Sequence, residues 1–465
     1  MNAVRRSLMN DKSSGSNIPN YLCLTALETG TFTFTYGSGV GIGSSNATSI
    51  SYSTDGVNWT KLDNVANQTV SITTPTIAAG GKVYWKGVNG RISIGASANQ
   101  YSCFSSTGDF DVNGDIGSIL FDDNFEERIP TVSLLYILHS LFRNSKVRDA
   151  SELKLFNNTG SSFVANNARY IYGYMFSGCS NLIAAPIIPN TFVGNNAYEY
   201  MFDGCSALTT PPDLPKTQLA GSIYKYMFQN CTSLTTIPEL PATTLYEDCY
   251  SGMFKGCTGL IQLPVNYELP ATSLTKNCYL DMFCNCSNLV NAPKLPATSI
   301  AYNSYAEMFY NCNALTNVPD IYLSSVTAYS CRAMFRGCTS LTNNPIKQFA
   351  SNTGNYCYQF MFDGTKITEL PELTASTLSA GAYWNMLSGV ATVTWIKILA
   401  LDVSASYSNA MSPSNRNGVY VKHIDATWTS NTPSKWTVIY YDPTVDKYYT
   451  DQTRSQECDD HGNPI

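Results

Sequence analysis

One pattern, Tyr-x-x-Met-Phe-x-Gly/Asn-Cys-x-x-Leu, recurs nine times between residues 172 and 390, with substitutions in the last three copies. Successive methionines lie 25 to 29 residues apart, most often 26. A fixed period in the range of about 20–50 residues is typical of a solenoid, in which each coil buries its apolar face only against its neighbours. We number the methionine as position 0 of each coil; the nine are Met175, Met201, Met227, Met253, Met282, Met308, Met334, Met361 and Met386.

Other positions of the repeat predict the core and the turns. Position +1 is Phe in eight coils, and position +4 is Cys and position +7 Leu in the same seven coils. Positions 0, +4 and +7 share one face of a helical turn, so we expect a short helix that points them into the core. Position +3 is always Gly or Asn, which best accept the left-handed conformation that ends a helix. Position −3 is Tyr in eight coils, which we interpret as half-buried ridges with hydrated hydroxyls.

The segments around the repeat predict a mainly β fold with short helices. Residues 20–127 contain strand-like runs, among them FTFTY (32–36), SISYS (49–53), KVYWKG (82–87) and ISIGA (92–96), and predict a β-sandwich-like domain. The other predicted segments are an N-terminal arm (1–19), a solenoid of about nine to ten coils (128–392) and a small C-terminal β module with a tail (393–465). Leu141-Phe142 occupies the Met-Phe positions of a degenerate first coil, as expected for a terminal repeat.

The consensus Met-Phe-x-Gly-Cys-x-x-Leu-Thr-x-x-Pro-x-Leu-Pro resembles the BspA-like, or Treponema-type, leucine-rich repeat. In that family Ala-Phe-x-x-Cys-x-x-Leu precedes a strand and Leu-Pro; here Met replaces Ala and the unit is longer. The resemblance covers about half of the chain, and the whole layout is similar to proteins of gut Bacteroidales and their phages. It implies an adhesin or a receptor-like surface protein.

The N-terminal sequence MNAVRRSLMNDKSSGSN lacks the apolar run of a secretion signal, and no apolar stretch is long enough for membrane insertion. We therefore expect a phage virion protein, made in the host cytoplasm and exposed on the particle surface. A bacterial cell-surface adhesin is the alternative. Charged residues make up only 13% of the chain and the net charge is −6, which argues against nucleic acid as a partner. The 15 cysteines are interpreted as buried thiols made in a reducing compartment.

Ligand binding is predicted on a polar stripe at position +9 and at a three-residue insertion between Met253 and Met282. The alternative for the stripe is an Asn/Thr ladder that satisfies only its own hydrogen bonds. The alternative for the insertion is a neutral loop that binds nothing. A basic N-terminal arm is predicted to dock on other virion proteins together with the sandwich; the alternative is a disordered leader. The binding candidates are Thr210, Thr236, Gln262, Asn266, Tyr267, Asn291, Asn317 and Asn343, and the docking candidates are Arg5, Arg6 and Lys12.

No catalytic residue, cofactor or metal site is predicted. The three histidines lie in separate segments and no nucleophile, phosphate-binding or zinc-protease motif is present. Cys278, Cys284 and Cys286 have no histidine nearby, whereas structural zinc needs four ligands. Asp109–Asp115 resembles the start of a calcium loop, but Leu120 stands where an EF-hand needs Glu, so we interpret it as a turn before a strand and leave a calcium site open.

The predicted function is therefore a non-enzymatic fibre or surface component that binds a bacterial surface glycan or protein through its solenoid. A purely structural component, such as a capsid decoration, is the alternative within phage biology. Whether the protein forms a homo-oligomer is left open. Trimers are common in fibres, but no heptad pattern in this sequence argues for a trimer.

Overall fold

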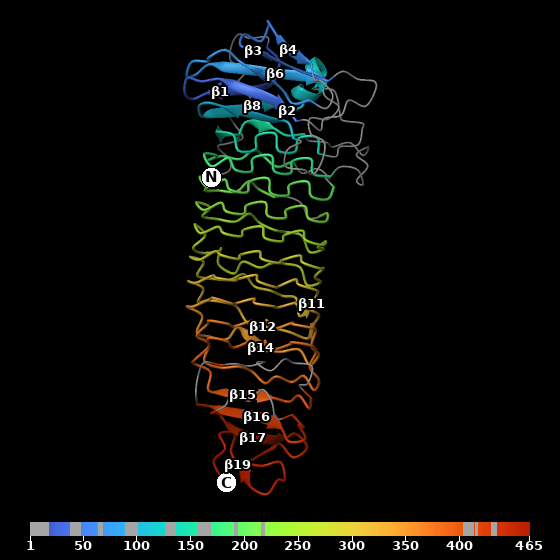
Figure 1. The fold of residues 1–465 in the computed structure, drawn as a ribbon, viewed down its shortest axis with the longest axis vertical. Coiled ribbons are helices and arrows are strands. Elements are labelled where there is room, and N and C mark those ends of the chain that lie inside the picture. Colours follow the sequence, from blue (N-terminus) through green and yellow to red (C-terminus); the bar gives the residue numbers. More distant parts are fainter. Residues whose placement is uncertain are drawn as a thin grey trace.

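The computed structural model is a rod with a β-sheet head at one end, a stack of coils along its length and a small sheet at the other end (Figure 1). It describes residues 18–37, 48–63, 68–88, 101–125, 136–156, 169–189, 194–214, 219–402, 413, 417–428 and 435–465. One hydrophobic core runs through all three parts, from Leu22 in the head to Trp436 near the other end. Among the described residues, no helix combines the length and apolar character needed to cross a membrane.

The head is built from two sheets that face each other. Trp85 packs between them, with its ring centroid 5.0 Å from Phe104 and 6.4 Å from Phe34. The three-stranded sheet has the order β5-β2-β7 and consists of β2 (Phe32–Tyr36), β5 (Val70–Thr73) and β7 (Cys103–Ser106). The larger sheet contains β1 (Leu22–Ala26), β3 (Ser49–Ser53), β4 (Thr60–Asp63), β6 (Lys82–Val88), β8 (Phe110–Asp115), β9 (Val147–Asp149) and β10 (Leu153–Lys154). The strands predicted at 32–36, 49–53 and 82–87 are confirmed, while ISIGA (92–96) lies outside the described residues.

The head and the solenoid share backbone hydrogen bonds and core. Strands β9 and β10 follow the degenerate first coil and pair parallel with β8 of the head. The Phe142 ring stacks on Phe104 of β7 at 5.4 Å and on Phe176 of the next coil at 5.4 Å. Leu141-Phe142 therefore occupies the Met-Phe positions of a first coil, and the head covers the end of the solenoid core.

The helix predicted around Met-Phe is wrong: the segment is a row of tight turns. Every second N–H bonds three residues back, as Met201 does to Tyr198 at 3.1 Å. The N–H groups between them bond to the next coil, as Phe202 does to Met227 at 2.9 Å. An α-helix would instead direct each N–H four residues back. The only helices in the described part of the chain are the short α1 (Ser118–Phe121) and the 3-10 helix η2 (Asp122–Asn124), both in the head.

Residues with a left-handed backbone conformation recur at fixed positions along this row of turns. Position +3 is left-handed in all nine coils, as its Gly or Asn predicted. Positions −5 and −1 are also left-handed in all nine coils, although they carry Tyr, Phe, Glu, Asp, Ser and Ala as well as Gly and Asn. An L-residue with a side chain costs about 1 kcal/mol or more in this conformation. The hydrogen bonds between coils therefore impose a backbone that the local sequence at −5 and −1 does not favour.

The predicted core columns are confirmed. The nine methionines are fully buried, and the Phe rings at +1 form a continuous stack from Phe142 to Phe362, with centroids 5.4 to 5.8 Å apart. Each of the seven +4 thiols donates to the carbonyl oxygen of the Phe in the preceding coil at 2.9 to 3.2 Å. Cys is therefore small enough for tight packing between coils and also supplies a weak donor there.

The prediction of half-buried tyrosines with hydrated hydroxyls at position −3 is wrong. All eight are at most 2% exposed, and most stack face to face with centroids 5.5 to 6.2 Å apart. They are a second aromatic column inside the core. The outward-facing tyrosines are instead those at −5 and −1, for example Tyr174 and Tyr200, which are half-buried.

Short parallel strands mark the other side of the later coils, and a sheet closes the rod. The coil strands are β11 (Ser299–Ile300) with β13 (Ser325–Val326) and β12 (Ile321–Tyr322) with β14 (Ile346–Gln348). In the closing sheet β15 (Trp395–Ile398), β16 (Val419–His423) and β17 (Thr437–Asp442) are parallel to one another. Strands β18 (Lys447–Tyr449) and β19 (Glu457–Cys458) extend this sheet, and each pairs antiparallel with the strand before it. The chain turns from β17 to β18 between Asp442 and Lys447, which form a pair in this hairpin.

Candidate binding surfaces

The +9 stripe lies at the surface along the solenoid. Five of its candidate side chains are exposed, and Asn291 is half-buried. The exposed ones are Thr210, Thr236, Gln262, Asn317 and Asn343. Neighbouring coils are joined here by their backbones: Asn291 and Asn317 form a parallel bridge, and the Ala292 N–H donates to the Asn317 carbonyl at 2.9 Å.

The stripe is not a self-satisfied side-chain ladder. Among its candidates in the described part of the chain, only Asn291 forms a side-chain hydrogen bond. Its Oδ1 accepts from the Leu263 N–H at 2.8 Å and its Nδ2 donates to the Leu263 carbonyl at 3.3 Å. Asn291 thus bonds to the preceding coil, whereas the five exposed stripe side chains have no hydrogen-bond partner among the described residues.

The insertion in the coil between Met253 and Met282 forms a tight turn with one anchor. Tyr267 is half-buried and its hydroxyl donates to the Pro238 carbonyl at 3.1 Å. Asn266 is exposed with a left-handed φ of 59°, and Val265 is 83% exposed. Ile261 and Val290, which are 60% and 37% exposed, lie beside each other on neighbouring coils. The predicted residue Tyr267 is therefore a structural anchor of the turn, and Asn266 is its exposed tip.

The row of turns carries aromatic residues that the sequence analysis did not select. In the coils nearest the head, five half-buried tyrosines stack in two files, at position −5 and at position −1. The first file has centroids 4.7 Å apart, and the second 4.6 and 4.8 Å apart. We call these five the tyrosine patch: Tyr136, Tyr170, Tyr174, Tyr200 and Tyr226. The signal that could have found the second file is a Tyr two residues after the buried column, as in Tyr172-Gly-Tyr174, Tyr198-Glu-Tyr200 and Tyr224-Lys-Tyr226.

A carboxylate lies among these rings. Burial raises the pKa of Glu199, whose one described hydrogen bond is from Asn196 Nδ2 to Oε2 at 2.7 Å. Burial, and then the charge of Glu199, raises the pKa of Tyr174 to about 12. Burial lowers the pKa of His139 to about 4, and its ring lies 5.2 Å from that of Tyr174. At neutral pH the tyrosine hydroxyls are thus protonated and the imidazole is uncharged.

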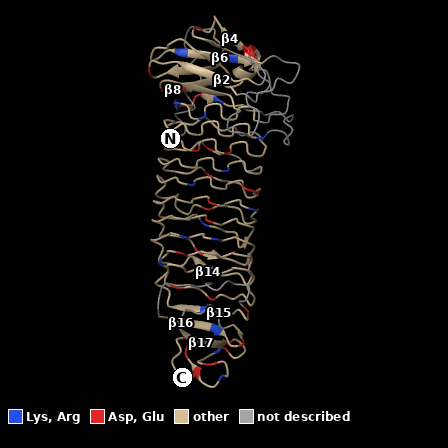
Figure 2. Cartoon of the chain, viewed as in Figure 1, with Lys and Arg blue, Asp and Glu red and all other residues tan. Residues whose placement is uncertain are grey.

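The middle coils carry ion pairs on the same row of turns. Lys255 pairs with Asp281 at 2.7 Å, and Arg332 pairs with Glu307 in the coils that follow. Figure 2 shows basic and acidic residues interspersed along the described part of the rod.

The sequences that suggested metal sites do not form clusters. Asp109–Asp115 is mostly strand β8 and not a turn before a strand, so that interpretation is wrong; Asp109 accepts a hydrogen bond from Asn181 and Asp115 from the Gly117 N–H. The Cys286 thiol donates to the Phe254 carbonyl like the rest of its column. Within the described residues, the one group of three ligating side chains is Asp459, Asp460 and His461, at the surface near the C-terminus. Asp459 already accepts three hydrogen bonds there, from His461 and Asn463.

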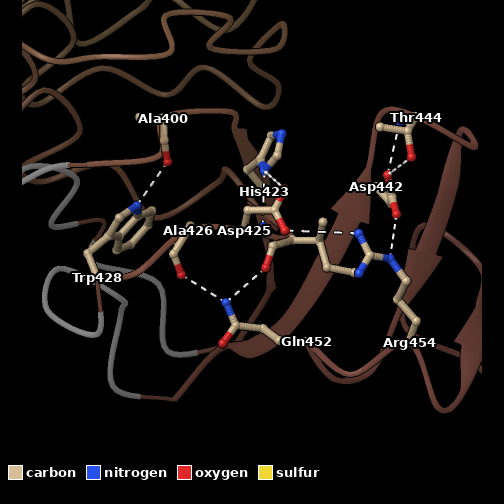
Figure 3. A network of polar contacts seen from close by, with 10 residues as sticks. Ala400, His423, Asp425, Ala426, Trp428, Asp442, Thr444, Gln452 and Arg454 are labelled. Atoms are coloured by element: carbon tan, nitrogen blue, oxygen red, sulfur yellow. Dashed lines mark hydrogen bonds and ion pairs between the residues drawn. The ribbon is translucent and has the colours of Figure 1, made fainter.

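The polar network at the closing sheet is structural (Figure 3). Gln452 donates to the carbonyls of Ile424 and Ala426, and Trp428 Nε1 donates to the Ala400 carbonyl at 2.9 Å. Hydrogen bonds from Thr444 and Arg454 lower the pKa of Asp442 to about 2. These contacts tie the C-terminal segment to the sheet. The predicted docking residues Arg5, Arg6 and Lys12 lie outside the described residues.

Comparison with protein families gives one match. Residues 153–290 and 279–386 match the BspA type leucine rich repeat region in six copies, which together span half of the chain. Neither a curated protein nor a solved structure matches the chain.

Proposed function

Because this chain belongs to the BspA-type leucine-rich repeat family, we propose that it is a non-enzymatic adhesion protein that binds a bacterial surface glycan or protein through its solenoid. The family indicates a repeat-based surface or adhesion-type protein. The observation that carries the proposal is the exposure of five polar side chains of the +9 stripe, without side-chain partners among the described residues. Exposed side chains repeated from coil to coil offer a ligand many weak contacts along one line.

Replacing three stripe residues together tests this role. We expect Thr236→Ala, Gln262→Ala and Asn317→Ala in one protein to weaken binding to bacterial cells without changing the melting temperature, because the three side chains are exposed. Asn355→Ala, an exposed residue in the row of turns, is the matched control. Equal binding by the triple variant and the wild type would place the ligand elsewhere.

A phage particle is the location we propose, on the resemblance described above. It predicts that antibodies against this protein label particles and that the protein co-purifies with them through a density gradient. Its absence from particles, together with labelling of the bacterial envelope, would favour a cell-surface adhesin.

A structural component is the second candidate. The unbroken core from the head to the closing sheet favours it, because a rod without a break in its core suits a spacer or a fibre segment. This candidate predicts that particles lacking the protein assemble incorrectly or fall apart, whereas a pure adhesin leaves assembly intact.

A further inference from the structure

The tyrosine patch is a local feature that the fold does not require. All coils share the same left-handed backbone at position −1, where φ is 55° for Tyr174, 60° for Gly252 and 53° for Asn385. Gly and Asn adopt this conformation most easily, and both occur in this column. Tyr, which adopts it less easily, is found at this position only in the coils next to the head. Strained side chains that the scaffold does not need often mark functional sites.

The patch presents both apolar and polar groups. Its five rings are half-buried, so part of each reaches solvent, and stacking at 4.6 to 4.8 Å holds them in fixed positions. Tyrosine gives large contact area at a low cost in conformational entropy, together with a hydroxyl that donates and accepts. Glu199 lies in the same region and adds a carboxylate with one hydrogen bond, from Asn196.

The charges around the patch are compensated. Arg143 lies over the Tyr174 ring at 5.0 Å, and its charge acts on Asp203. Lys225 lies over the Tyr226 ring at 6.0 Å, its charge acts on Glu199, and it forms an ion pair with Asp248 at 3.5 Å. Arg169, whose charge acts on Tyr136 and Tyr170, is a third cation. Three cations and three carboxylates therefore balance, so the surface does not select a strongly charged ligand.

We propose that the tyrosine patch and Glu199 form a binding site for an uncharged glycan of the bacterial surface. A pyranose ring offers apolar C–H edges next to hydroxyls, which match tyrosine rings next to phenol and carboxylate oxygens. The two files run along the rod from coil to coil, which suits an extended chain of sugars. The proposal rests on the adhesion function proposed above. It adds a glycan-binding site on the row of turns to the binding surface proposed at the +9 stripe.

The test uses the full chain and a set of immobilised polysaccharides: mannan, dextran and laminarin as neutral probes, and alginate as an acidic one. The first variant is Tyr174→Asn with Tyr200→Asn, because Asn tolerates the left-handed conformation and keeps the fold. The second is Glu199→Gln, which keeps the shape of the side chain. Tyr329→Asn is the control, because Tyr329 is left-handed and stacked, on Tyr356, outside the patch.

We expect the wild type to bind at least one neutral polysaccharide, and the double tyrosine variant to lose about tenfold or more in affinity, as for central aromatic residues of a binding site. Glu199→Gln weakens the same interaction, whereas Tyr329→Asn leaves it unchanged and all variants melt like the wild type. Equal affinity of the double variant and the wild type overturns the proposal, as does binding to alginate alone. Cell binding that survives the patch variants but is lost on changing the +9 stripe refutes this site and leaves the adhesion function intact. No binding to cells by any form refutes both.

Discussion

The Cys231 thiol donates a hydrogen bond to the Phe202 carbonyl oxygen of the preceding coil at 3.1 Å. The same carbonyl also accepts from the N–H of Cys205, the cysteine of its own coil, at 3.1 Å. This carbonyl therefore takes part in one hydrogen bond that closes a turn and in a second one that joins two coils. Repetition of this contact in seven coils explains why a small polar sulfur recurs where a purely apolar side chain would also fill the space.

The first prediction concerns this contact. Cys257→Ala removes the sulfur that donates to the Phe228 carbonyl and leaves a small cavity in a fully buried column. We expect a loss of about 1–2 kcal/mol in the free energy of unfolding, from lost packing and the lost hydrogen bond. Thr258→Ala, at the partly exposed neighbour, is the control and stays within about 0.5 kcal/mol of the wild type. Denaturant unfolding measures both, and equal losses would contradict the role given to the thiol.

The second prediction separates two costs of adding a methyl group to a glycine. At Gly204 the φ is 73°, but an added Cβ meets nothing closer than 3.7 Å, so Gly204→Ala costs about 1 kcal/mol from conformation alone. At Gly259 an added Cβ would lie 2.7 Å from the Thr232 carbonyl oxygen and 2.8 Å from that of Leu234. Gly259→Ala therefore moves the neighbouring coil and costs about 3 kcal/mol. Denaturation midpoints decide the order, and a smaller loss for Gly259→Ala would contradict the packing between coils.

The third prediction uses the buried tyrosine column. The Tyr198 hydroxyl is buried and has no partner among the described residues, whereas the Tyr172 hydroxyl accepts from the Phe156 N–H at 3.1 Å. Tyr198→Phe removes an unpaired polar group, so we expect an unchanged or higher melting temperature. Tyr172→Phe leaves a backbone donor without its partner and lowers stability by about 1 kcal/mol. Equal effects of the two changes would mean that both hydroxyls are satisfied.

The columns of buried residues show which features of the fold the sequence could predict and which it could not. The period and the apolar positions predicted the core correctly, because burial of Met, Phe, Cys and Leu follows from side-chain chemistry alone. The helix was wrong because Met201, Cys205 and Leu208 obey a helical spacing, yet the Phe202 N–H bonds to the next coil, a contact that is invisible in one repeat. The Tyr at −3 looked amphipathic, but its neighbours above and below cover its ring.

The row of turns was missed for a related reason. Gly and Asn at +3 predicted a left-handed residue from their own preference. Tyr174 and Glu307 at −1 are left-handed because the hydrogen bonds between coils impose this conformation. Sequence reasoning placed the candidate ligand site on the +9 stripe, which does lie at the surface. It could not place the tyrosine patch, because the two files are brought together only when the coils stack.

The fourth prediction concerns pH. Burial, and then the charge of Arg143, lowers the pKa of His139 to about 4, below its ordinary value of about 6.5. Between these two values the unfolded chain binds a proton that the folded chain does not, so stability falls as the pH is lowered from about 6.5 towards 4. Gln359 occupies the matching position in a later coil, so His139→Gln is the appropriate variant. It flattens this part of the stability profile, and an unchanged slope in the variant would show that other groups set it.

Adhesion through the solenoid can be measured as binding of the labelled, multimerised protein to a panel of bacterial cells and their purified capsular glycans. We expect saturable binding to some strains, competition by unlabelled protein and a matching response on the glycan of those strains. Uniform absence of saturable binding, with the protein shown to be folded by a cooperative melting transition, would refute adhesion and favour the structural role.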